Sequence, residues 1–188
     1  PPETSLRQLY EAYEEKHERK LSPLTVDTAP WQEIVMDGPE VDVYQLPAPM
    51  VHDGDGGRYI GTWDIIVTRD PDTGWTNWGM YRFMIHTKNM LTGWPQATSQ
   101  LAIMMKSKYL PRKQAMPVAV VIGCEPLCHM VATDPYKPGE NEVEYAGGLR
   151  GEPVKLVRCK TQNLLVPADA EIVIEGELLP DRIALEGP

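Results

Sequence analysis

The chain has 188 residues, of which 42% are hydrophobic and 24% are charged, and its formal net charge is −9. This length suits one globular domain with a substantial core. The negative charge argues against nucleic acid as a partner, because phosphate contacts need clustered Lys and Arg side chains. No run of about 18 apolar residues occurs, so we expect no membrane span. The first four residues lack the pattern of a signal peptide.

The three cysteines, Cys124, Cys128 and Cys159, are an odd number in a chain long enough to fold without disulfides. We therefore expect reduced thiols in or near the core of a cytoplasmic protein. Cys124, Cys128 and His129 lie close together in the sequence and could suggest a metal site. A second pair of ligands is missing from this pattern, so the metal interpretation is disfavoured.

The first predicted element is a helix over residues 5–20, with Thr4 or Ser5 as its cap. We assign residues 1–29 to this helix and a connector, which resembles an appendage to a domain formed by residues 30–188. The apolar stripe of the helix consists of Leu6, Leu9, Tyr10 and Tyr13.

A proline-rich segment follows the connector. Short extended pieces are expected at residues 33–36 and 41–46, on either side of an Asp-Gly-Pro turn. Residues 52–57 form an acidic, glycine-rich loop. Such a loop can bind calcium, but this one lacks the spaced series of ligands, so a plain turn is the favoured interpretation.

The clearest pair of strands surrounds the turn at residues 70–74. Residues 58–69 are rich in β-branched and aromatic side chains, and residues 76–87 form the return strand of a hairpin. Because side chains alternate between the two faces of a strand, Asn77 and Arg82 are expected on opposite faces. A guanidinium that leaves an apolar surface needs a fixed partner. A salt bridge at a sheet edge is the plain alternative to a functional role for Arg82.

The rest of the chain reads as short elements that alternate between helix and strand. They are irregular chain at 91–96, a helix at 98–110, a strand at 116–123, a short helix or strand at 128–132, a helix at 142–149 that ends at Gly147-Gly148, and strands at 154–160 and 170–179. The sum predicts an α+β domain dominated by an antiparallel sheet that curls into a barrel.

Six blocks of sequence keep their order over nearly the whole chain. They are DGGRYI at 55–60, TNWGMYR at 76–82, MPVAVVIG at 116–123, EVEYAGGLRG at 142–151, AEIVIEG at 170–176 and LEGP at 185–188. In these blocks the chain resembles the UbiD-type decarboxylases, which use prenylated FMN. The resemblance implies a split β-barrel related to flavin reductases, with peripheral helices, that carries most of the cofactor site. It also implies that the family's C-terminal domain is absent from this chain.

The resemblance assigns roles to residues at matching positions. Arg82 and Glu186 match two members of a Glu-Arg-Glu catalytic network, whose second Glu would lie beyond residue 188. Asn77 and Glu142 match ligands of a divalent metal, Mn²⁺ or Mg²⁺, that bridges the flavin phosphate. The implied cofactor contacts are Thr62, Asn77, Gly79, Met80, Tyr81, Arg82, Trp94, Gln100, Thr133 and Pro135.

One position departs from the family. A metal-ligand His usually follows the position of Gln100, whereas this chain has Leu101, and none of its four histidines falls there. Two alternatives are therefore open: a divalent metal held by the remaining ligands, and a site that holds water or a monovalent ion such as K⁺.

With a complete site, the resemblance implies reversible decarboxylation of an aromatic, heteroaromatic or α,β-unsaturated acid, which releases CO₂. Glu186 would donate a proton in a water-poor pocket, and Arg82 would hold a carboxylate by a forked hydrogen bond. A homo-oligomer or complementary subunits would complete the enzyme. The alternatives are a non-catalytic flavin-binding or scaffold subunit, and a plain flavin reductase, which is disfavoured because it gives Arg82 and Glu186 no role.

Overall fold

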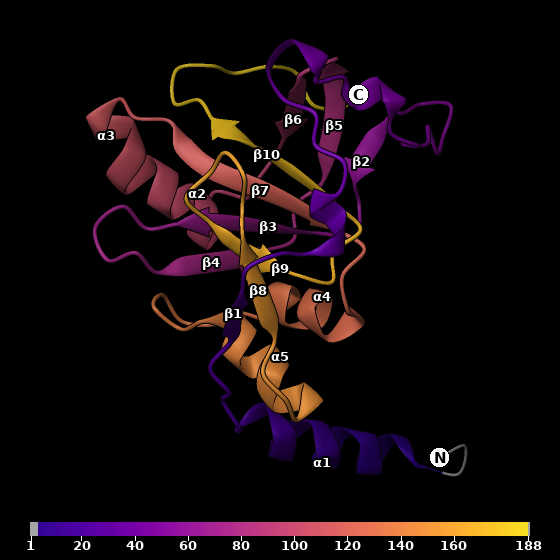
Figure 1. The fold of residues 1–188 in the computed structure, drawn as a ribbon, viewed down its shortest axis with the longest axis vertical. Helices are drawn as coiled ribbons and strands as arrows, with labels where there is room; N and C mark the ends of the chain where they lie inside the picture. Colours follow the sequence, from indigo (N-terminus) through magenta and orange to yellow (C-terminus); the bar gives the residue numbers. More distant parts are fainter. Residues whose placement is uncertain (1–3, 188) are drawn as a thin grey trace.

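Three hydrogen-bonded sheets carry the fold of residues 4–187, the part of the chain that the computed structural model describes (Figure 1). Residues 1–3 of the predicted N-terminal segment and Pro188 of the last matching block lie outside it. The central antiparallel sheet has the strand order β10 (Ile172–Leu178), β7 (Met116–Ile122), β3 (Asp64–Arg69) and β4 (Thr76–Gly79). The second sheet has the order β2 (Tyr59–Gly61), β5 (Phe83–Thr87) and β6 (Met90–Gly93). The third has the order β1 (Leu24–Val26), β8 (Lys155–Arg158) and β9 (Leu165–Pro167).

The helices begin largely where the sequence predicts them. Ser5 caps the first helix and forms a capping box with Gln8, and Ser99 caps the helix predicted at residues 98–110. Among the described residues, no helix combines the length and the apolar character needed to cross a bilayer. The helices are α1 (Leu6–His17), α2 (Gln100–Met104), the π-helical turn η4 (Met105–Tyr109), α3 (Leu110–Arg112), α4 (Pro126–Thr133) and α5 (Glu142–Arg150).

The predicted long hairpin is present, but each of its strands is interrupted, at residues 62–63 in the first strand and at residues 80–82 in the second. β3 pairs with β4 in the central sheet, and Ile66 faces Gly79 there. Before β3 and after β4, the chain enters the second sheet, where Gly61 of β2 faces Phe83 of β5. Asn77 and Arg82 therefore do not share one continuous strand, contrary to the prediction. The residues in the two breaks, 62–63 and 80–82, include several of the predicted site residues.

A closed barrel does not form within residues 4–187, so the predicted split β-barrel is correct only as a mixed fold of several sheets and helices. The breaks in the hairpin interrupt the hydrogen-bonded ladder, and β4 and β10 remain edge strands of the central sheet. The extended pieces predicted at 33–36 and 41–46 are also wrong. Residues 33–36 form irregular chain between two 3₁₀ turns, η1 (Pro30–Gln32) and η2 (Gly38–Glu40), and residues 41–46 contain a third, η3 (Val43–Gln45). The irregular chain predicted at 91–96 contains β6 instead.

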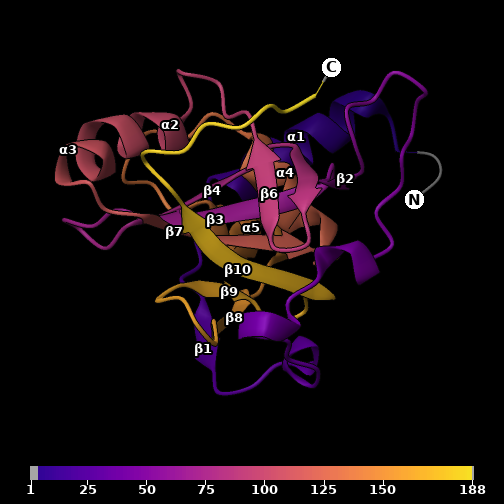
Figure 2. The ribbon, with the colours of Figure 1, turned by 90° about the horizontal axis from the view of Figure 1, so that it is seen from above.

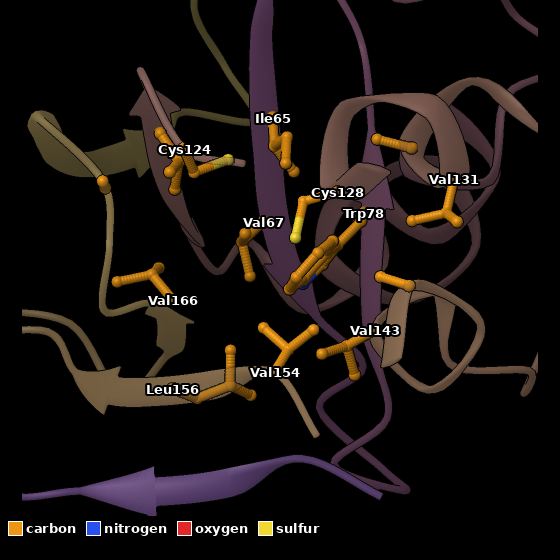
Figure 3. Close-up of a cluster of buried hydrophobic side chains, with 14 of the residues drawn as sticks. Ile65, Val67, Trp78, Cys124, Cys128, Val131, Val143, Val154, Leu156 and Val166 are labelled. Carbon is orange, nitrogen blue, oxygen red and sulfur yellow. The ribbon is translucent and has the colours of Figure 1, made fainter. Parts of the chain in front are cut away.

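Two apolar clusters lie on opposite faces of the central sheet, as the alternation of side chains along β3 requires. Ile65 and Val67 point into the first cluster, which α4 and α5 cover and which contains Trp78 (Figure 3). Ile66 points into the second, together with Leu101 of α2 and Met116 of β7. All three cysteines are free and buried, as predicted. Each fully buried aliphatic side chain in such a cluster stabilises the fold by roughly 1.5–3 kcal/mol.

Gly147 and Gly148 do not end α5, contrary to the prediction, since the helix continues to Arg150 and Gly151 caps it at a φ of 85°. Their role is close packing. A Cβ atom on Gly148 would lie 1.4 Å from the carbonyl oxygen of Arg19, in the segment that follows α1. Leu21 of the same segment donates its backbone N–H to the carbonyl of Glu144. The chain after α1 therefore lies directly on the backbone of α5.

We predict that Gly148→Ala destabilises the protein by about 1–3 kcal/mol, because the added methyl group meets backbone atoms that no rotamer change can move. Alanine would otherwise favour a helix by up to about 1 kcal/mol. Gly176→Ala is the control, since nothing lies within 4 Å of the added Cβ there. Urea denaturation measures both. An unchanged or increased midpoint for Gly148→Ala would contradict the close approach.

Candidate functional site

The first part of the candidate site is an ion pair between the break in the hairpin and the C-terminal segment. Arg82 immediately precedes β5, and Glu186 lies 104 residues further along the chain. Nε of Arg82 is 2.9 Å from Oε1 of Glu186, and Nη2 is 3.0 Å from Oε2. This forked geometry holds a carboxylate in a fixed orientation. The Glu186 side chain is only 5% exposed, whereas that of Arg82 is 51% exposed.

The residues around this pair come from two of the sequence blocks, DGGRYI at 55–60 and LEGP at 185–188. The Arg82 guanidinium lies over the ring of Tyr59 in β2, 5.4 Å from its centroid. Gly187 has a φ of 83°, and a Cβ atom there would lie 3.1 Å from the Tyr59 hydroxyl. Gly56 packs against the backbone of Gly187. The segment after β10 thus returns across the molecule, past β6, to the second sheet (Figure 2).

The charges of the pair reinforce one another. Hydrogen bonding and the negative charge of Glu186 raise the pKa of Arg82, so the guanidinium remains charged. Burial, followed by the nearby Glu186 carboxylate, raises the pKa of Tyr59, so its phenol remains protonated. The site therefore presents one exposed cation, one buried carboxylate and one buried neutral phenol.

The second part of the candidate site contains the two predicted metal ligands. Asn77 in β4 is 2% exposed, and Glu142 in the first turn of α5 is 3% exposed. Nδ2 of Asn77 and Oε2 of Glu142 are buried without a hydrogen-bond partner. Burial raises the pKa of Glu142 to about 7, although a backbone hydrogen bond from Trp78 opposes the rise. Because unpartnered buried polar atoms are costly, this pair is suited to a ligand that satisfies them.

A third side-chain ligand is lacking here. Leu101 is 1% exposed and packs in the second apolar cluster with Met104 and Phe83. Within residues 4–187, no group of three or more His, Cys, Asp or Glu side chains is arranged to hold a metal. The donors that are present, an amide and a carboxylate, suit a hard cation. They fit one only if further oxygen ligands, such as those of a phosphate group, complete the coordination.

Tyr81 connects the amide of Asn77 to α2. Burial raises the pKa of its hydroxyl, while the neighbouring polar groups of Ser99, the cap of α2, and of Asn77 oppose the rise. Its ring packs over Gly79, where a Cβ atom would lie 2.6 Å from the ring. Gly79, Asn77 and Tyr81 therefore lie together next to the break in the hairpin.

The other predicted cofactor contacts are spread more widely. Gln100 donates from Nε2 to the carbonyl of Tyr136, which follows the exposed Pro135. Trp94 is 72% exposed. Among the described residues, no hydrogen bond or ion pair joins Thr62, Trp94 or Thr133 to the Arg82–Glu186 pair. The exposed residues are Thr62, Trp94, Thr133 and Pro135, while Met80 is half-buried.

Two residues near the break were not predicted from the sequence. Tyr59, under the Arg82 guanidinium, is an aromatic residue inside the DGGRYI block, which was a usable signal. Asp64 opens β3 and is fully buried, with both carboxylate oxygens unpartnered. Burial raises its pKa to about 7. The sequence signal that could have identified Asp64 is its place as an acidic residue directly before the apolar run Ile65, Ile66 and Val67.

Comparison with known proteins gives a consistent result. A protein-family model described as UbiD, 3-octaprenyl-4-hydroxybenzoate carboxy-lyase Rift-related domain, matches residues 24–188. Pyrrole-2-carboxylic acid decarboxylase of Pseudomonas aeruginosa is 38% identical over 168 residues, which are 89% of this chain and 34% of that protein. Ferulic acid decarboxylase 1 of Saccharomyces cerevisiae is 32% identical over 193 positions, which cover 100% of this chain and 38% of that protein. The chain thus spans about a third of the length of these curated relatives.

Solved structures show the same likeness. The UbiD-class enzyme HmfF from Pelotomaculum thermopropionicum, in complex with FMN, has a TM-score of 0.91 and 30% identity, and the match covers 99% of this chain and 42% of that one. Vanillic acid decarboxylase of Sedimentibacter hydroxybenzoicus in closed form has a TM-score of 0.93 and 28% identity, over 99% of this chain and 40% of that one.

The buried Asp64 carboxyl predicts a pH dependence of stability. Its pKa is raised from 3.8 to about 7 in the folded state, so the folded protein binds more protons than the unfolded chain between these values. The free energy of unfolding should therefore fall as the pH rises from about 4 to 7, by at most about 4 kcal/mol from this group. Asp64→Asn removes the titration.

Thermal unfolding at pH 5 and pH 8 tests this prediction. We expect Asp64→Asn to match the wild type at pH 5 and to be more stable at pH 8, because the amide carries no charge. Asp53→Asn, at an exposed position, is the control and should change neither value. Equal pH profiles for Asp64→Asn and the wild type would show that Asp64 is ionised without cost.

Proposed function

The chain belongs to the UbiD family, and from this premise we propose that it is the prenylated-FMN-binding part of a reversible decarboxylase. Its substrates would be aromatic, heteroaromatic or α,β-unsaturated carboxylic acids, with CO₂ as the product. The named relatives are decarboxylases of pyrrole-2-carboxylic and ferulic acids. A related HmfF structure is a complex with prenylated FMN. Because the chain spans only part of such proteins, the rest of the site would come from further chain or from another subunit.

The observation that carries the proposal is the forked pair of Arg82 and Glu186. A simple surface salt bridge contributes little to stability and has no need of a carboxylate that is 5% exposed. A half-exposed guanidinium beside a buried carboxylate can instead hold a substrate carboxylate and a proton donor in adjacent positions. A plain flavin reductase would use neither.

Prenylated FMN, when bound, would supply the electronic stabilisation that loss of CO₂ from an unsaturated carbon requires. Arg82 would orient the substrate carboxylate through its forked donors. Glu186, whose carboxyl group lies beside that guanidinium, would deliver a proton to the carbon that CO₂ has left. The Tyr59 ring would support the guanidinium from below.

Asn77 and Glu142 would hold the phosphate end of the cofactor through a cation. A phosphate dianion beside the Glu142 carboxylate is repelled unless a cation lies between them or Glu142 is protonated. Mn²⁺, Mg²⁺ and K⁺ all accept oxygen ligands of this kind. Since Leu101 provides no donor, the flavin phosphate itself would complete the coordination.

One observation favours the alternative of a non-catalytic flavin-binding or scaffold subunit. Leu101 stands where the family has a ligand and is packed into the core. A subunit that kept the fold and lost the metal would look like this.

We extend the proposal to assembly as a homo-oligomer or with complementary subunits. We also propose that the protein lies in the cytoplasm, since the three cysteines are free thiols.

We predict that Arg82→Ala and Glu186→Gln each lower decarboxylation by about 10²-fold or more, as expected for loss of an acid–base group or of its orienting partner. The full-length enzyme loaded with prenylated FMN is assayed for CO₂ release and for deuterium exchange into the product. Arg7→Ala is the control, since it removes the exposed pair of Arg7 with Glu11 on α1. Unchanged turnover in both site variants would favour the scaffold alternative.

We also predict that the wild-type protein purified with FMN and Mn²⁺ retains less than one Mn²⁺ per chain, and that Leu101→His raises Mn²⁺ affinity by at least about 10-fold. Met104→His places a histidine at a buried position of the same helix and should leave metal content unchanged. Elemental analysis after gel filtration measures all three. One tightly held Mn²⁺ per wild-type chain would show that Asn77, Glu142 and phosphate suffice.

A further inference from the structure

The helix α1 contributes almost nothing to the core, because none of its residues is buried. It nevertheless lies across α5, at the end of the molecule (Figure 1). Apart from Tyr13, which is half-buried against the first apolar cluster, polar and stacking contacts hold it in place. Such contacts are directional and fix geometry more than they add stability. The sequence interpretation of α1 as an appendage does not account for them.

The contacts of α1 converge on residues 134–140, the segment that joins α4 to α5. Tyr13 donates its hydroxyl to Oδ2 of Asp134 at 2.6 Å. Nε2 of His17 lies 2.7 Å from the hydroxyl of Tyr136 and 3.9 Å from Oδ2 of Asp134. Tyr13 and His17, one turn apart on α1, thus bind Asp134 and Tyr136 at the start of this segment.

Aromatic stacking adds to these bonds. The His17 ring is stacked with the rings of Tyr145 in α5, at a centroid distance of 4.7 Å, and of Tyr136, at 5.5 Å. Tyr13 stacks on the same imidazole at 5.3 Å. Four rings from α1, the joining segment and α5 therefore form one continuous cluster, which we call the His17 cluster: Tyr13, His17, Tyr136 and Tyr145.

The far end of the segment is held in the same way. Glu140 accepts hydrogen bonds from Tyr145 at 2.7 Å and from Lys20, just after α1, at 3.3 Å. The backbone carbonyl of Glu140 accepts from Nε1 of Trp75 at 2.7 Å, which ties the segment to the chain that enters β4.

The segment held by α1 carries or contacts one end of the proposed cofactor site. The carbonyl of Tyr136 accepts from Gln100, and Pro135 immediately precedes it. Asn141, the cap residue of α5, follows the segment, and Glu142 comes next with its unpartnered oxygen. A shift of the segment would therefore move Gln100, Pro135 and Glu142 together.

We propose that α1, through Tyr13, His17 and Lys20, is a positioning element for the phosphate-and-cation end of the flavin site. This inference rests on the proposed function, because it concerns the same site. Tyr13, His17 and Lys20 contact no residue of the Arg82–Glu186 pair. They act by fixing residues 134–140, and hence Glu142, relative to β4.

The test compares two tyrosines of the same helix. Tyr13→Phe removes one hydroxyl that bonds to Asp134, and Tyr10→Phe removes one that bonds to Glu14 at 2.7 Å on the exposed side. Fluorescence titration of the full-length protein with FMN and Mg²⁺ gives the dissociation constants. We expect about a 3- to 30-fold weaker affinity for Tyr13→Phe and no change for Tyr10→Phe. His17→Gln should behave like Tyr13→Phe.

Riboflavin, which lacks the phosphate, separates positioning from general loosening of the fold. Tyr13→Phe should leave the riboflavin affinity within about 2-fold of the wild type. Equal losses for FMN and riboflavin, or equal FMN affinities for Tyr13→Phe, Tyr10→Phe and the wild type, would overturn the inference alone. Absence of FMN binding by the wild type would overturn the cofactor part of the proposed function, and the inference with it.

Discussion

The ion pair of Arg82 and Glu186 is the interaction on which the arrangement of the candidate site depends. It joins two parts of the chain that are 104 residues apart, and it places a carboxylate where little water reaches it. Removing Arg82 would leave the carboxylate of Glu186, whose side chain is 5% exposed, without a partner, which costs more free energy than the pair contributes. Gly56 packs closely on the backbone of Gly187, the residue that follows Glu186. The C-terminal segment is therefore held to the second sheet by electrostatics and close packing, rather than by a strand of its own.

The break in the hairpin explains how this pair and the buried amide can belong to one site. A continuous strand would place alternate side chains on opposite faces, and Asn77 would then point away from Arg82. Because the chain leaves the central sheet after Gly79 and enters the second sheet at Phe83, residues 80–82 are free of that alternation. Tyr81 uses this freedom to reach both Asn77 and the cap of α2. Irregular backbone between the two sheets thus brings Tyr81 beside Asn77, while Arg82 adjoins the second sheet.

Local signals in the sequence predicted the elements that local interactions determine. The Ser5 cap, the turn after Arg69 and the apolar strand β7 are all present. The break at residues 80–82 could not be predicted, since the hydrophobic pattern runs through it and its cause is the divergence of two sheets. The three-residue strands β1 and β9 are too short to have a period, and the close packing at Gly148 depends on a segment more than a hundred residues away. The roles of Arg82, Glu186, Asn77 and Glu142 came from family resemblance, and they remain predictions even though the structure brings these residues into suitable surroundings.

The division of the site between two sheets has a mechanical consequence. Asn77 is fixed to the central sheet through β4, whereas Arg82 adjoins β5 of the second sheet, and only the short stretches 62–63 and 80–82 connect the sheets along the hairpin. The second apolar cluster, which holds Ile66 of β3 and Phe83 of β5, also joins the two sheets. The separation between Asn77 and Arg82 is therefore set by irregular backbone and by core packing, and not by the fixed repeat of a single strand.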